Sequence, residues 1–222
     1  EKEKLFFYNI KKIEKIKIII IEQIFKTLSN YNFENIIITG SFLEGGFNFN
    51  DIDIILIYNK NINIETIRNE LKENIGVNAH LILIDYKSLL KGISADPLFQ
   101  TMFSNYISKK RFIYNPKPEI KYKLLDLNLL KSELLIKNFD TLKIEDKLDL
   151  LRNLIGINLF ITKKQIISKG EVYKKIKEIF GNSIIDDLKN NLINKKEFVK
   201  KYKMVYGKTF NLILKNIKNE QE

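Results

Sequence analysis

Two aspartates, Asp51 and Asp53, stand two residues apart at the start of an apolar run over residues 54–57. Side chains alternate along a strand, so both carboxylates are expected on one face of it. They would lie roughly 6–7 Å apart and repel each other unless a cation lay between them. Because hard oxygen ligands suit Mg²⁺, Asp51 and Asp53 are candidate metal ligands. The alternative is that Asp51 is a turn residue, since asparagines crowd the preceding loop.

A glycine-rich turn, GSFLEG, precedes the two aspartates. Glycine lets the backbone approach a phosphate closely, and a serine at the start of a helix offers a hydroxyl and free N–H groups to an anion. Gly40, Ser41 and Gly45 are therefore candidate nucleotide-binding residues. A phosphate-binding turn beside a metal site is typical of phosphoryl and nucleotidyl transfer. The alternative is purely structural, because Ser41 and Glu44 also have the spacing of a capping box.

The hydrophobic pattern predicts the elements that position these residues. Strands and helices alternate up to residue 115, which favours an α+β domain around a mixed sheet. Asn63 is the expected N-cap of one helix. The predicted strands cover residues 35–40, 51–58, 77–85 and 111–115, and the predicted helices cover residues 9–29, 61–75, 86–92 and 97–110.

The second half of the chain has only helical patterns. Pro116 and Pro118 interrupt the chain before it, because proline cannot continue a helix and restricts the residue that precedes it. Capping boxes at Ser168 and Asn194 predict two helices, and apolar spacing predicts two more over residues 119–139 and 142–166. We therefore expect four or five helices to pack as a bundle. The predicted domains cover residues 1–115 and 116–222.

The glycine turn and the aspartate pair together resemble the signature of the DNA polymerase β-like nucleotidyltransferase superfamily. In that signature Gly-Ser follows a strand, a glycine comes four or five residues later, and Asp-x-Asp opens the next strand. Here GSFLEG and NDIDIIL carry the resemblance. The helical half is similar to the C-terminal bundle of the kanamycin-type adenylyltransferases.

This resemblance implies a nucleotidyltransferase-type mixed sheet and a Mg²⁺-dependent enzyme. Asp51 and Asp53 would hold the metal, two ions when a nucleotide is bound, and Gly40 and Ser41 would hold the triphosphate. The reaction would transfer a nucleoside monophosphate, with AMP as the first choice, from a nucleoside triphosphate to a hydroxyl. The acceptor would be a small molecule or a protein.

The predicted strand over residues 77–85 departs from the superfamily pattern, as does Glu44, which stands where the pattern often has a basic residue. A third carboxylate usually stands on the strand after the helix, and here His80, the chain's single histidine, falls there, while Asp85 comes only at the strand end. His80 could accept a proton or lie beside the metal near neutral pH, or it could be a buried core histidine. Glu133 and Glu145 of the helical half are further candidates for a general base.

Composition limits the remaining function classes. The absence of cysteine excludes disulfides and thiolate chemistry, and no apolar run is long enough for a membrane helix. These two observations favour a cytoplasmic protein.

The net charge of +11 divides into +2 for residues 1–115 and +9 for residues 116–222. A basic surface attracts polyanions, although dispersed lysines favour only weak nucleic-acid binding. A second hypothesis is therefore a catalytically weakened module that binds a nucleotide, a nucleic acid or a partner protein, and oligomerisation stays open.

Overall fold

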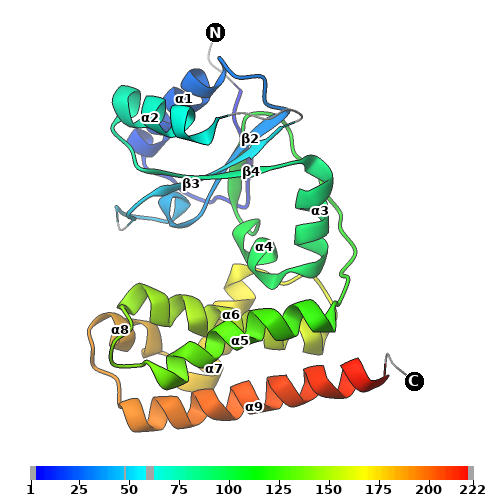
Figure 1. Ribbon diagram of the computed structural model, residues 1–222. Coiled ribbons are helices and arrows are strands. Elements are labelled where there is room, and N and C mark those ends of the chain that lie inside the picture. The colour runs from blue at the N-terminus through cyan, green and yellow to red at the C-terminus, as the bar shows by residue number, and fades with distance from the viewer. Residues whose placement is uncertain (1–3, 48, 59–62, 220–222) are drawn as a thin grey trace. The chain divides into compact units, whose positions relative to one another are not determined.

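The computed structural model describes residues 4–47, 49–58 and 63–219. Over these residues the chain has nine α-helices and one mixed sheet of five strands (Figure 1). The α+β class predicted from the sequence is therefore confirmed. Within the same residues, no helix has the length and apolar character that crossing a membrane requires.

The sheet has the strand order β1-β5-β2-β3-β4. Strands β2 (Asn35–Thr39) and β3 (Ile52–Ile57) are antiparallel, and β4 (Ala79–Ile84) runs parallel to β3. The short strands β5 (Tyr106–Ser108) and β1 (Phe6–Tyr8) extend the sheet on the other side of β2. The apolar runs predicted as strands thus form the centre of the sheet, where every residue of β2 is buried.

Helices α1 (Lys15–Leu28) and α2 (Ile64–Ile75) lie together against one face of the sheet (Figure 1). Their apolar side chains share a buried core with alternate residues of β3, namely Ile52, Ile54 and Leu56. Because side chains alternate along a strand, Asp53 points to the opposite face. The pattern that buries β3 against these helices therefore also directs Asp53 away from them.

Several predicted boundaries are confirmed and others are wrong. Asn63 caps α2 as predicted, because its side chain accepts the N–H groups of Glu65 and Thr66. The helix predicted from residue 9 begins only at Lys15, since the residues before it lead from β1.

The helix predicted over residues 97–110 was wrong beyond its first part. Helix α4 (Pro97–Met102) is followed by β5, whose residues pair with both β1 and β2, so long-range pairing outweighs the local helical pattern. The strand predicted over residues 111–115 was also wrong. Phe112 and Tyr114 pack instead against a cluster of aromatic rings that includes Phe103 and Tyr106.

Over residues 116–219 the structure has five helices, and their apolar residues share one buried core. The bounds of these helices are α5 (Tyr122–Lys137), α6 (Ile144–Lys163), α7 (Lys169–Phe180), α8 (Ile184–Lys189) and α9 (Lys195–Asn219). Helix α8 was not predicted, because six residues are too few to show helical periodicity.

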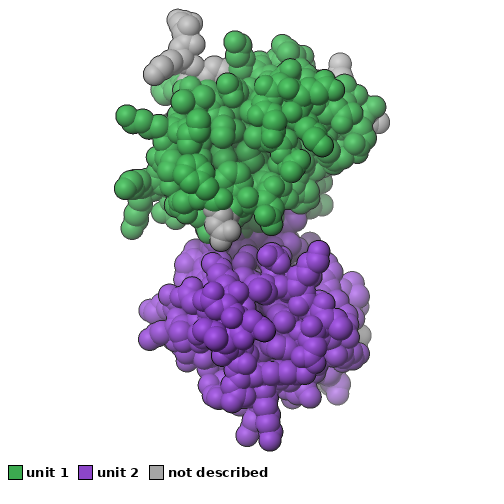
Figure 2. Space-filling model, turned by 90° about the vertical axis from the view of Figure 1, so that its left-hand side faces the viewer, with its two compact units in different colours: residues 1–92, 102–115 green, residues 93–101, 116–222 purple. Residues whose placement is uncertain are grey.

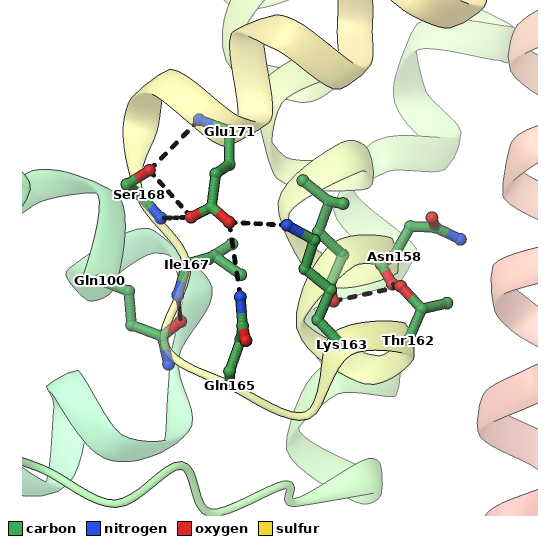
Figure 3. Close-up of polar contacts among 9 residues, drawn as sticks. Gln100, Asn158, Thr162, Lys163, Gln165, Ile167, Ser168 and Glu171 are labelled. Atoms are coloured by element: carbon green, nitrogen blue, oxygen red, sulfur yellow. Dashed lines mark hydrogen bonds and ion pairs between the residues drawn. The ribbon is translucent and has the colours of Figure 1, made fainter.

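The capping box predicted at Ser168 is confirmed at the start of α7 (Figure 3). The Ser168 hydroxyl accepts the Glu171 N–H, and the Glu171 carboxylate accepts the Ser168 N–H at 2.8 Å. The same carboxylate forms an ion pair with Lys163 at 2.6 Å. At the predicted start of α9, the Asn194 side chain accepts the Glu197 N–H at 3.2 Å.

The chain divides into two compact units (Figure 2), whose residues are 1–92 with 102–115, and 93–101 with 116–222. Residues 93–101, which the sequence placed in the first domain, group with the helical unit. The Ser94 carbonyl accepts the Glu119 N–H at 2.9 Å. The Gln100 side chain accepts the Ile167 N–H at 3.1 Å (Figure 3).

Candidate functional site

Asp53 lies on β3 directly between Thr39 of β2 and His80 of β4. Asp53 Oδ1 is 2.8 Å from His80 Nδ1. The Asp53 side chain is 26% exposed and the His80 side chain 58% exposed. This exposure rules out the interpretation of His80 as a buried core residue. The register of the parallel pair thus brings two of the predicted residues together at the surface.

Gly40 is the third predicted residue at this place. It has φ +87° and ψ −164°, a conformation that is essentially restricted to glycine. A Cβ added to it would lie 2.0 Å from Asp53 Oδ2. The glycine is therefore needed both for its backbone conformation and for the space that the Asp53 carboxylate occupies.

Ser41 begins a single 3₁₀ turn, η1 (Ser41–Leu43), directly after Gly40. Its side chain is exposed, whereas Phe42 and Leu43 are buried and hold the turn against the core. No α-helix follows this turn in the described residues that lead to β3, so the capping-box interpretation of Ser41 has no helix to begin. Ser41 thus offers its hydroxyl to solvent beside Gly40.

The loop after this turn is held by two residues of α1 that the sequence did not single out. The Gly46 N–H donates to Glu14 Oε1 at 2.6 Å, and the Lys17 ammonium donates to the Glu44 carbonyl at 2.5 Å. Lys17 also lies 3.1 Å from Glu14 Oε2. The Gly46 hydrogen bond is the main cause that lowers the pKa of Glu14 to about 2. In the sequence, this pair has the spacing of an ordinary surface ion pair on a helix.

Asp51 lies in a bend just before β3 and is exposed. The strand begins at Ile52, so the alternation assumed for the two aspartates applies to Asp53 alone. Over residues 4–47, 49–58 and 63–219, no group of three or more His, Cys, Asp or Glu side chains could hold a metal ion.

The carboxylates of Asp51 and Asp53 nevertheless suit a Mg²⁺ ion that binds together with a nucleotide. Magnesium keeps several waters, and proteins hold it through one or two carboxylates together with substrate phosphates. Asp53 and Asp51 can supply these carboxylates without a third acidic residue.

The other candidates lie elsewhere. Asp85 follows β4 and caps α3 (Tyr86–Ala95), because its side chain accepts the Ser88 N–H at 2.9 Å. Hydrogen bonds from the Ser88 side chain and from the Ser88 backbone lower the pKa of Asp85. Gly45 is exposed, with open space around its Cα. Glu133 lies on α5, where it pairs with Lys137 at 3.1 Å.

Glu145, the second base candidate from the helical half, lies in the first turn of α6. Both glutamates thus belong to the helical unit, whereas Asp53 and His80 belong to the sheet unit. The residues that the structure brings into contact are Gly40, Asp53 and His80.

The helical unit has a separate open groove that four lysines help to line. Lys195 forms an ion pair with Asp140, whereas no described residue forms an ion pair with the other three. The groove is lined by Ile136, Lys195, Lys196, Val199, Lys200 and Lys203.

Comparison of the chain with protein-family models, with curated proteins and with solved structures gave no match. The case for a function therefore depends on the sequence motif and on the geometry of these sites.

Proposed function

We propose that the chain is a Mg²⁺-dependent nucleotidyltransferase that transfers a nucleoside monophosphate, AMP for preference, from a nucleoside triphosphate to a hydroxyl. The nucleotidyltransferase-type sheet and the helical bundle expected from the sequence belong to this proposal. The observation that carries it is the contact of Gly40 with the Asp53 carboxylate, which in turn meets His80. Three residues chosen from the sequence thus lie next to one another where β2 ends and where β3 and β4 begin.

Each residue has a role in this reaction. Mg²⁺ held by Asp51 and Asp53 would neutralise charge on the phosphates when bound. The N–H groups of the turn and the exposed Ser41 hydroxyl would bind phosphate oxygens. Gly40 leaves room for the Asp53 carboxylate beside the turn.

His80 is suited to accept the proton of the attacking hydroxyl. Asp53 Oδ1 faces His80 Nδ1, so the carboxylate favours the tautomer with the proton on Nδ1 and a free lone pair on Nε2. The acceptor oxygen forms a bond to the α-phosphorus, and its proton passes to Nε2. The bond between the α-phosphorus and the bridging oxygen breaks, and pyrophosphate leaves with that electron pair.

The direct test is incubation with each α-³²P-labelled nucleoside triphosphate and Mg²⁺, with and without cell extract. A labelled small molecule or protein together with pyrophosphate is expected, with ATP as the best donor. Asp53→Asn should abolish labelling. His80→Ala should lower it strongly, whereas His80→Asp should retain part of it, because the carboxylate can take the proton. No labelling with any triphosphate would refute the proposal.

The lysine groove favours a second candidate function, the binding of a polyanion. Lys196, Lys200 and Lys203 follow one another along one side of α9, and Ile136 and Val199 line the same groove. The test measures single-stranded RNA affinity at several salt concentrations. Changing all three lysines to glutamate should weaken binding and flatten its salt dependence. Tight, salt-sensitive binding that survives Asp53→Asn would make this candidate the better one.

A further inference from the structure

We propose that Glu14 and Lys17 are positioning residues that hold the loop after β2 in the conformation that binds a triphosphate. This inference rests on the proposed nucleotidyl transfer. Neither residue belongs to the glycine turn or to the aspartate pair, and both come from the start of α1. They contact backbone groups of the loop, whereas the Ser41 side chain is exposed and makes neither contact.

The Lys17 ammonium is fully buried, which is rare for a lysine. It lies 2.5 Å from the Glu44 carbonyl oxygen and 3.1 Å from Glu14 Oε2. A buried ammonium without partners is strongly unfavourable. Any loop conformation that withdraws the Glu44 carbonyl would therefore leave Lys17 with one partner fewer in an apolar setting.

Aromatic rings complete the surroundings of this ammonium. Its Nζ lies 5.5–5.6 Å from the ring centroids of Phe42, Phe47 and Phe49. Attraction of a cation to ring faces is stronger where water is excluded. All three rings belong to the segment between β2 and β3. Lys17 therefore contacts side chains of this segment as well as a backbone carbonyl of it.

Glu14 fixes a second point of the same loop. Its Oε1 accepts the Gly46 N–H at 2.6 Å, two residues beyond the carbonyl that Lys17 binds. Gly46 has φ +80°, a conformation that other residues rarely adopt. Asp53 packs against Gly40 at one end of the turn, and Glu14 binds the Gly46 N–H at the other end. The intervening turn therefore has little conformational freedom. A rigid turn loses less entropy when it binds a ligand.

The test combines calorimetry of a non-hydrolysable ATP analogue with Mg²⁺ and hydrogen exchange of peptides covering residues 40–47. Lys17→Met and Glu14→Ala should each weaken nucleotide affinity about tenfold or more. Both should accelerate exchange of the loop amides, above all that of Gly46.

Two variants act as matched controls. Glu14→Gln keeps an oxygen acceptor for the Gly46 N–H and should retain most of the affinity. Lys15→Met makes the same change as Lys17→Met on the same helical turn, but at an exposed position, and should leave both readouts unchanged.

The readouts separate positioning from a merely structural role. If Lys17→Met and Glu14→Ala lowered only the melting temperature, while the folded proteins kept wild-type affinity and loop exchange, the positioning role would be refuted. Should Lys17→Met fail to fold, Glu14→Ala decides the question, because the Glu14 side chain is 32% exposed. Absence of nucleotide binding by the wild-type protein would instead refute the proposed function. Unchanged hydrogen exchange of the loop in the variants would refute the claim that Glu14 and Lys17 stabilise the loop conformation.

Discussion

Replacing Gly40 by alanine is the sharpest perturbation of the proposed site. The added Cβ would lie 2.0 Å from Asp53 Oδ2 and 3.0 Å from Asp53 Cγ. Contacts below 3.0 Å to a Cβ are essentially never seen, so the carboxylate must move by about 1 Å or the backbone must shift. The backbone conformation is also unfavourable for the substitution, because alanine is strained at φ +87° and ψ −164°.

These two effects set the expected magnitudes. The unfavourable backbone conformation should lower the free energy of unfolding by about 1–3 kcal/mol. A displacement of about 1 Å in a catalytic group is enough to lower turnover roughly 100-fold. Moving the carboxylate also disturbs the 2.8 Å contact between Asp53 and His80. Gly40→Ala should therefore reduce stability moderately and nucleotidyl transfer severely.

The assay is labelled-nucleotide transfer at a temperature where the variant is folded, together with urea unfolding. Gly207→Ala is the matched control, because Gly207 lies inside α9 with open space around its Cα. In a helix interior the same change should raise stability by up to about 1 kcal/mol. A Gly40→Ala protein with wild-type stability and transfer would refute the reasoning about this site.

Three further predictions concern single residues. Asp53→Asn should abolish transfer and change the melting temperature by only a few degrees, because its partly exposed pair with His80 contributes about 0–1 kcal/mol; a large loss of stability would indicate a structural role. The folded-state pKa of Glu14, about 2, lies below its ordinary 4.5. Its stabilisation is therefore complete above pH 4.5 and disappears as the pH falls through 2, so the melting temperatures of wild type and Glu14→Gln should converge over that interval in calorimetry, and a constant difference would contradict this. Ser168→Ala should lower the free energy of unfolding by about 1 kcal/mol in urea titrations, whereas Ser168→Thr should retain the cap; equal losses in both would argue against the capping role.

Local signals in the sequence identified the centre of the fold well. Strands β2 and β3 contain the apolar runs 36–38 and 54–57, and Asn63 stands where α2 begins. The contact between Asp53 and His80 depends on the register of a parallel pair, which no local pattern specifies. Both residues could nevertheless be selected from the sequence, Asp53 by the Asp-x-Asp spacing and His80 because it falls where the resembled superfamily has a third carboxylate.

Features that depend on distant partners were not predictable. The residues of β5 become a strand only because β1 and β2 lie beside them, whereas their local pattern is compatible with a helix. Lys17 resembles any other lysine in a lysine-rich helix, and its burial depends on a loop that begins more than twenty residues later. The glycine at position 40 was the one local sequence signal that the backbone there approaches another group closely, and the structure shows that this group is Asp53.

The position of β5 in the sheet also sets the order in which the chain can fold during synthesis. Strand β1 precedes the other described strands in the chain, and within the described residues it pairs with β5 alone, which is made about a hundred residues later. Until Tyr106–Ser108 leave the ribosome, β2 has an open edge, and an open edge invites pairing with other chains. Fragments that end before residue 106 should therefore aggregate. A fragment cut at residue 115 would complete the sheet but separate residues 93–101 from the helices that they contact.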